Sequence, residues 1–162
     1  MSQSNVVSIA RTETGYLVSV HGQGTRHESP AVRDFISGAM EDRANVVLDL
    51  TECEYLDSTF LGCLVILHKR GCDKGERFRV HADAAVINKL LHPTRLDTII
   101  SCCSTLPKTS GQTVPLPIAD LDREEFGRHL LDTHEELAHV DSPSSGAFRM
   151  VAEQLRRELG ET

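Results

Sequence analysis

The chain has 162 residues, of which 40% are hydrophobic and 4% aromatic, with no tryptophan and a formal net charge of −7. This length predicts one domain of ordinary size plus an appendage, and the hydrophobic fraction suffices for a packed core. The negative charge and the scarcity of aromatic side chains argue against nucleic acid or an anionic membrane as a partner. Residues 118–162 hold 11 acidic and 5 basic residues, so −6 of the net charge lies in this last segment.

The N-terminus and the cysteines indicate a cytoplasmic location. Residues 1–5 lack a basic start followed by an apolar core, so no signal peptide is expected. No apolar run reaches the roughly 20 residues that span a bilayer. The five cysteines show no Cys-x-x-Cys pair and no metal-site spacing, which predicts reduced thiols. We therefore expect a soluble protein with no membrane insertion, no metal and no other cofactor.

The first third of the chain predicts a hairpin and a helix. Residues 6–10 and 16–20 are two β-type runs around a turn at residues 12–15, and the glycines of residues 21–24 then interrupt the regular structure. Ser29 and Pro30 predict a helix start, with Ser29 as the cap. The helix that follows has one apolar face, formed by Val32, Phe35, Ile36, Ala39 and Met40.

A strand and a helix form the centre of the predicted fold. The apolar residues of the segment 46–50 are typical of a strand covered on both faces. After a short polar loop, an apolar helix begins at Asp57 and Ser58. It is expected to end near Lys69 and Arg70, with Gly71 just beyond.

The next elements complete an α/β pattern. Phe78 and Val80 alternate with polar residues, as in a half-buried strand near a sheet edge. Asp83 can cap a helix that ends before Pro93, and residues 99–100 are expected to form a last short strand. The order β-β-α-β-α-β-α-β predicts an α/β sandwich, a mixed sheet with helices packed on it. This order suits several small α/β folds.

The C-terminal third predicts a linker and a helical hairpin. Residues 104–117 contain three prolines and one glycine among serines and threonines, which is typical of a linker. Residues 118–162 follow with a capping-box pattern at Asp122–Glu125. Two apolar stripes then predict an α-hairpin: Phe126, Leu130, Leu137 and Val140, with His134 among them, and Phe148, Val151, Leu155 and Leu159. Neither stripe can remain in water, so the hairpin must dock somewhere.

No catalytic or metal-binding constellation emerges from these residues. His129, His134 and His139 are spaced by five, which rotates each by about 140° around a helix, so they are not expected to share a face. No nucleophile, base and orienting group come together in the pattern, so no enzyme is predicted.

The central segment resembles a known family. The Leu-Asp-Leu of residues 48–50, a gap, and Leu56-Asp-Ser-Thr-Phe-Leu-Gly62 resemble the signature of STAS domains, specifically of bacterial anti-sigma-factor antagonists. The resemblance covers roughly residues 5–101 and implies a STAS domain at residues 1–103. Many members have glycine where this chain has Phe60, whose ring is either part of the core or an exposed anchor for a partner or for the C-terminal hairpin.

The resemblance implies that Ser58 is phosphorylated by a serine kinase that is itself the anti-sigma factor. From the residues alone, Ser58 is either a helix cap or also a switch, and Asp57 either caps the helix or orients Ser58 towards the phosphate and metal ion of the kinase. Thr59 is a second, minor acceptor candidate. A phosphoryl group at a helix N-terminus is tolerated by the helix dipole, so phosphorylation is expected to change association and not the fold.

The prediction is therefore a phosphorylation-switched interaction module. Its unphosphorylated form binds the anti-sigma factor kinase, and a serine phosphatase restores binding after phosphorylation. The expected partner surface consists of Glu54, Asp57, Ser58, Thr59, Phe60 and Gly62. The hairpin is expected either to form a homodimer or to cover part of the STAS surface. Two alternatives stay open: a STAS subunit of a lipid or anion transporter, and a scaffold in a signalling assembly.

Overall fold

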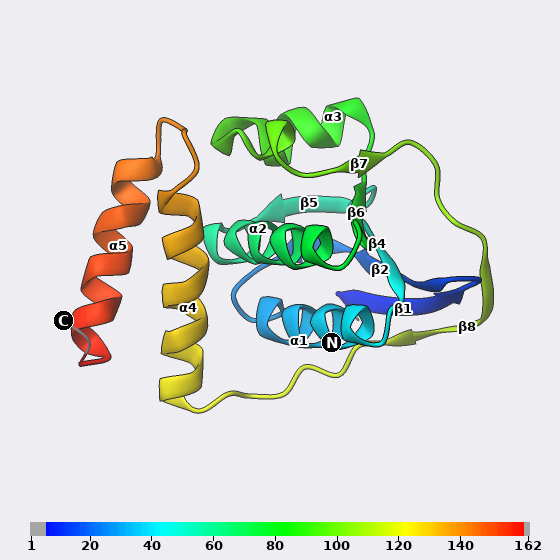
Figure 1. Cartoon of the computed structure of the whole chain (residues 1–162), viewed down its shortest axis with the longest axis horizontal. Helices are drawn as coiled ribbons and strands as arrows, with labels where there is room; N and C mark the ends of the chain where they lie inside the picture. Colours follow the sequence, from blue (N-terminus) through cyan, green and yellow to red (C-terminus); the bar gives the residue numbers. More distant parts are fainter. Residues whose placement is uncertain (1–5, 161–162) are drawn as a thin grey trace.

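A six-stranded mixed sheet forms the centre of the protein in the computed structural model, which describes residues 6–160 (Figure 1). The strands are β1 (Val7–Thr12), β2 (Gly15–Val20), β4 (Asn45–Asp49), β6 (Phe78–His81), β7 (Cys102–Cys103) and β8 (Thr109–Pro115). Their order is β7-β6-β4-β2-β1-β8, with β1 antiparallel to β2 and β8, and the other neighbours parallel. This mixed sheet with packed helices confirms the predicted α/β class.

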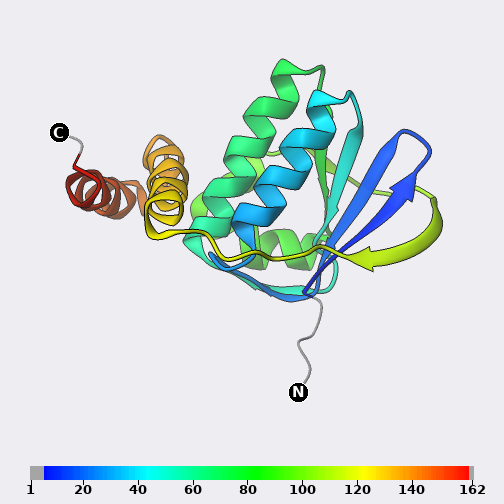
Figure 2. The same ribbon diagram turned by 90° about the horizontal axis from the view of Figure 1, so that it is seen from below.

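The structure confirms the predicted strand as the central β4, but only one of its faces is fully buried, since Val47 on the other face stays partly exposed. This strand pairs with β2 on one side and β6 on the other, and Val46 and Leu48 have 1% and 0% of their surface exposed. Parallel neighbours require crossover connections, which α1 (Ser29–Glu41) and α2 (Ser58–Asp73) help to provide. The two helices lie side by side against the sheet (Figure 2).

A second, two-stranded sheet was not predicted. β3 (Gly22–Gly24) pairs in parallel with β5 (Cys53–Leu56), where the sequence suggested an interruption and a loop. At Gly24 an added Cβ would lie 2.7 Å from a methyl of Leu56 and 3.0 Å from the Phe60 ring. A glycine is therefore required for this close approach, and the same residue that lowers strand propensity makes the pairing possible.

Two helix boundaries differ from the prediction. Ser29 is the first residue of α1 and makes no capping bond; Glu28 occupies the N-cap position. The prediction of Ser29 as the cap was wrong, because its hydroxyl bonds a residue of the C-terminal hairpin instead. α2 extends past Gly71 to Asp73, with Gly75 beyond it at φ +90°. Gly71 serves packing, since an added Cβ would lie 2.8 Å from the Cβ of Phe78.

Helical turns fill the segment between β6 and β7. Asp83 caps α3 (Ala84–Val86) by accepting the Val86 N–H, as predicted, and irregular helical turns continue over Ile87–Leu91, His92–Thr94 and Leu96–Thr98. The predicted strand at residues 99–100 was wrong. Ile100 is buried at the end of these turns, and the strand β7 follows at Cys102.

The segment predicted as a linker contains a strand. β8 lies within residues 104–117 and pairs with β1 at the sheet edge, although each of its seven residues is exposed. With no buried side chain, the strand has no alternation of apolar and polar residues that could reveal it in the sequence.

The two C-terminal helices form the predicted hairpin. They are α4 (Arg123–Ala138) and α5 (Ser145–Glu158), and the capping box between Asp122 and Glu125 is present. α4 lies at one end of the α1–α2 pair, with α5 outside it (Figure 2). The hairpin therefore docks on the sheet-and-helix domain of the same chain.

Candidate functional site

The first turn of α2 is held in place by Asp57. One carboxylate oxygen of this N-cap residue accepts the Phe60 N–H at 2.9 Å, and the other accepts the Arg26 N–H at 2.7 Å. Asp57 thus caps α2 and ties it to the loop before α1 with both oxygens. Ser58 comes next as the first helical residue and is partly exposed.

The predicted partner-contact residues have very different exposures. Glu54 on β5 is exposed, and Asp57 and Ser58 are partly exposed. Thr59 and Phe60 are buried, at 3% and 0% exposure, so the Phe60 ring belongs to the core and is not an exposed anchor. Of the two predicted hydroxyl acceptors, Ser58 is therefore the accessible one. Gly62 is also buried, because α4 covers it.

Ser58 bonds directly to a histidine of the hairpin. Its Oγ lies 3.0 Å from Nε2 of His134 on α4, and Nδ1 of the same ring lies 2.8 Å from the Leu130 carbonyl oxygen. A carbonyl oxygen can only accept, so Nδ1 carries a proton, and in the neutral ring Nε2 accepts the Ser58 hydroxyl hydrogen. The Phe148 ring of α5 packs edge-on against His134, with ring centroids 6.0 Å apart. The His134 ring is therefore buried, with 6% exposure, between Ser58 and Phe148.

At Gly62, α4 packs directly against α2. An added Cβ would lie 2.3 Å from the backbone oxygen of Thr133 and 2.6 Å from its Cβ. Because the obstructing atoms include α4 backbone, only glycine fits at this position with the hairpin docked. Ser58 and Gly62 are four residues apart and lie on the same face of α2.

A second serine–histidine pair anchors α4 on α1. Nε2 of His129 lies 2.7 Å from Ser29 Oγ, and a guanidinium N–H of Arg33 points at Nδ1 from 3.4 Å. Arg33 also pairs with Asp132 at 3.1 Å. Burial, reinforced by the charge of Arg33 and by His134, lowers the pKa of His129 to about 4, so this histidine is neutral at pH 7.

Further charge pairs surround this contact. Glu136 of α4 forms an ion pair with Lys69 of α2, and Glu135 of α4 pairs with Arg156 of α5. Leu131 and Leu137 add apolar contact, with 2% and 1% exposure. The hairpin is therefore docked by polar pairs as well as by two buried leucines.

The sequence reasoning considered the histidines only as metal ligands and missed their role in docking. His129 and His134 both contact the sheet-and-helix domain, although they are about 140° apart on the helix. This is possible because α4 crosses two helices, so that one histidine meets α1 and the other meets α2. The position of His134 inside an apolar stripe was the available signal.

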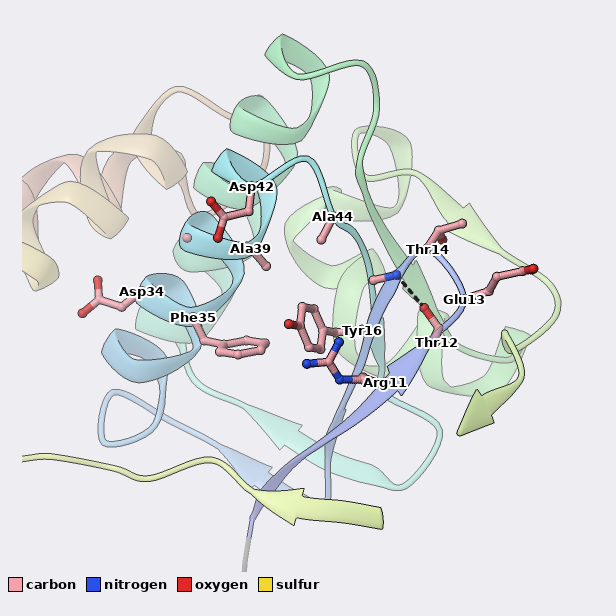
Figure 3. Close-up of a pocket in the computed structure, with 12 residues that line it drawn as sticks. Arg11, Thr12, Glu13, Thr14, Tyr16, Asp34, Phe35, Ala39, Asp42 and Ala44 are labelled. Carbon is pink, nitrogen blue, oxygen red and sulfur yellow. Dashed lines mark hydrogen bonds between the residues drawn. The ribbon is translucent and has the colours of Figure 1, made fainter. Parts of the chain in front are cut away.

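A separate cleft of about 560 Å³ lies between the β1–β2 hairpin and α1 (Figure 3). The edge-on rings of Tyr16 and Phe35, with centroids 5.1 Å apart, and Arg11 above the Tyr16 ring line it. None of the predicted site residues lies there. Across residues 6–160, no histidine, cysteine and carboxylate side chains cluster as a metal site, and no helix is both long and apolar enough to cross a membrane.

Comparison with known proteins supports this architecture. The chain is similar to the structure of the anti-sigma factor antagonist SpoIIAA in its unphosphorylated form, with 12% identity, a TM-score of 0.51, and coverage of 62% of this chain and 89% of that chain. It is also similar to an anti-sigma factor antagonist from Mycobacterium paratuberculosis, with 24% identity, a TM-score of 0.52, and coverage of 65% and 92%. At these identities the two structures show a shared fold.

The sequence also matches a family model described as "Mlab, STAS domain" over residues 7–101. This range runs from β1 to the residue before β7 and ends before the hairpin. Because the match spans more than half of the 162 residues, the chain belongs to the STAS domain family.

Proposed function

We propose that this chain is an anti-sigma-factor antagonist that binds an anti-sigma factor with serine kinase activity while Ser58 is unphosphorylated. The observation that carries the proposal is the position of Ser58, a partly exposed residue that begins α2, next to a fully engaged cap. The fold shared with two anti-sigma factor antagonists supports the same class of partner.

The switch is a phosphoryl transfer to Ser58. The Ser58 oxygen bonds to the γ-phosphorus of ATP, the bond from that phosphorus to the bridging oxygen breaks, ADP leaves, and a base of the kinase takes the hydroxyl proton. The product carries about −1.5 to −2 charges at pH 7, which the N-terminus of α2 accommodates. A partner surface fitted to a small neutral hydroxyl then meets both bulk and charge. A loss of about 3 kcal/mol would weaken binding by about two orders of magnitude.

The exposed residues beside Ser58 suit a basic partner surface. Glu54 is exposed and Asp57 partly exposed, and the neighbouring Tyr55 has 51% of its surface exposed. Aromatic side chains are enriched at protein interfaces, and exposed carboxylates complement a positively charged patch on a partner. Dephosphorylation by a serine phosphatase would return the chain to its binding form.

The test is capture from a lysate of the source organism with the wild-type chain and with Ser58→Glu. We expect the wild type to capture an ATP-binding serine kinase and Ser58→Glu to lose it. The captured kinase should transfer labelled phosphate from ATP to the wild type and not to Ser58→Ala. Ser104→Glu, which adds the same charge at an exposed serine after β7, is the matched control and should retain the kinase. Equal capture by wild type and Ser58→Glu would refute the switch.

A second candidate, which membership of the STAS domain family leaves open, is a STAS subunit of a lipid or anion transporter. Such a subunit would bind a cytoplasmic ATPase or permease domain without serine phosphorylation. In the same experiment it would capture transporter components with wild type and Ser58→Glu alike. Capture of neither class, but of a large assembly, would indicate a scaffold.

A further inference from the structure

We propose that the α4–α5 hairpin is an intramolecular competitor for the Ser58 surface, so that the hairpin must leave before a partner binds or Ser58 is phosphorylated. This inference rests on the proposed function. Its structural basis is that α4 contacts the same turn of α2 that the partner and the kinase would need.

The Ser58 rotamer that bonds His134 has no space for a phosphoryl group while the hairpin is docked. Ser58 Oγ and His134 Nε2 are one hydrogen bond apart, at 3.0 Å. Phosphorylation would insert a phosphorus and three oxygens at Oγ. The ring of His134 packs against Phe148 and is hydrogen-bonded to the Leu130 carbonyl oxygen, so it cannot move away from Ser58 while α4 stays docked.

Charge acts in the same direction. The segment 118–162 holds 11 acidic and 5 basic residues, and α4 carries Asp132, Glu135 and Glu136 on the turns around His134. Phosphorylation would add about −1.5 to −2 charges beside this acidic helix. Because Asp132, Glu135 and Glu136 are each ion-paired with a cation, the repulsion comes from the net charge of −6 of the segment. It adds to the steric conflict and favours the released hairpin.

The hairpin covers only part of the predicted partner surface. Gly62 lies under the Thr133 backbone and Ser58 under His134, whereas Glu54 of that surface and the adjacent Tyr55 are exposed. A partner can therefore first contact the exposed Glu54 and Tyr55 while α4 is docked. Complete engagement of Ser58 then requires displacement of α4.

The attachment of the hairpin suits release. Residues 116–122 connect it to β8 without regular structure, and they include Pro117. The docking contacts include ion pairs, Arg33 with Asp132 and Lys69 with Glu136, which lie outside the predicted partner surface. The contact also buries Leu137 and Val140 against the core, so release exposes apolar surface as well as breaking these pairs. Interfaces between units of one chain that mix polar and apolar contacts can open and close.

The test is hydrogen–deuterium exchange of the full chain, unmodified and with phosphoserine installed at position 58. We expect exchange of the α4 amides, residues 123–138, to be at least about tenfold faster in the phosphorylated chain, as for a segment that opens locally. The β4 amides, residues 45–49, report on global unfolding and should keep their protection. Equal protection of α4 in both chains would overturn the proposal.

A charge exchange outside the partner surface provides an independent route. Arg33→Glu faces Asp132 with a like charge and should release α4 in the unmodified chain, whereas Arg33→Glu with Asp132→Arg should restore protection. Arg33→Glu should also raise the rate at which the kinase phosphorylates Ser58, and the double variant should return it to the wild-type rate. A released hairpin with an unchanged phosphorylation rate would contradict competition.

These outcomes separate this inference from the proposed function. If a kinase is captured in a Ser58-dependent way but phosphoserine leaves α4 protected, the antagonist function holds and the competition fails. If phosphoserine releases α4 but no kinase is captured, the masking of Ser58 holds and the proposed partner fails.

Discussion

Ser58, the first residue of α2, donates its hydroxyl hydrogen to Nε2 of His134, 76 positions further along the chain, over 3.0 Å. The contact joins the STAS domain to a segment that the family model does not include. Whether Ser58 can carry a phosphoryl group therefore depends on whether this contact is formed or broken.

The Ser58–His134 bond should be measurable as a coupling energy. Ser58→Ala leaves the buried Nε2 of His134 without a donor, which should cost about 1–3 kcal/mol of unfolding free energy. In a double-mutant cycle with His134→Phe, the two changes should be coupled by about 1 kcal/mol in urea unfolding. Strictly additive effects would show that the hydrogen bond contributes nothing to docking.

Gly62→Ala should loosen the hairpin although it improves the helix. Alanine favours a helix interior over glycine by about 1 kcal/mol, yet here the added methyl meets α4 backbone at 2.3 Å, an overpacking that costs about 1–3 kcal/mol. We expect faster amide exchange in α4 with protection of β4 unchanged.

Gly38→Ala is the matched control for this change. Gly38 is also within a helix, α1, but an added Cβ there meets nothing within 4 Å. It should raise the unfolding free energy by about 1 kcal/mol and leave exchange in α4 unaltered. If the two alanine variants behaved alike, α4 would not be packed on Gly62.

His129 should make docking sensitive to acid. Its pKa of about 4 when docked lies below the value of 6.5 for a free histidine, so only the undocked or unfolded chain takes up a proton between these values. Stability should be constant above pH 6.5, fall as the pH drops towards 4, and level off below. The total loss is about 3 kcal/mol. Arg33, which also pairs with Asp132, and His134 both oppose protonation of the ring.

The pH effect can be isolated with His129→Gln. Urea unfolding of this variant should be less dependent on pH between 6.5 and 4.5 than unfolding of the wild type, by about 2 kcal/mol. A wild-type curve parallel to that of the variant would mean that His129 is protonated in the docked state.

The cysteines should differ sharply in their reactivity towards thiol reagents. Burial raises the pKa of the Cys63 thiol to about 12, and this side chain has no exposed surface. Cys72 is exposed on the last turns of α2. Alkylation of the native chain at pH 8 should modify Cys72 rapidly and Cys63 only after unfolding. Labelling of Cys63 in the native chain would require α1 and α2 to separate.

Local patterns in the sequence were sufficient to predict those elements that bury side chains of their own. The apolar run of β4 and the Asp57 cap of α2 are readable because strand burial and capping depend on neighbouring residues. The resemblance of residues 48–62 to STAS domains added the family, which the match over residues 7–101 confirms. β3, β5 and β8 were missed, because each depends on a distant partner strand and the seven residues of β8 bury nothing.

By itself, the sequence determined that residues 118–162 form two amphipathic helices whose apolar faces need a partner surface. Periodicity reveals which face of a helix is buried and not what covers it. Only the tertiary structure decided that α4 lies across α1 and α2, with His129 on Ser29 and His134 on Ser58. The physical reason is that three interactions require segments distant in sequence to be in contact. These are the close packing at Gly62, the hydrogen bonds of Ser29 and Ser58, and the ion pair of Arg33.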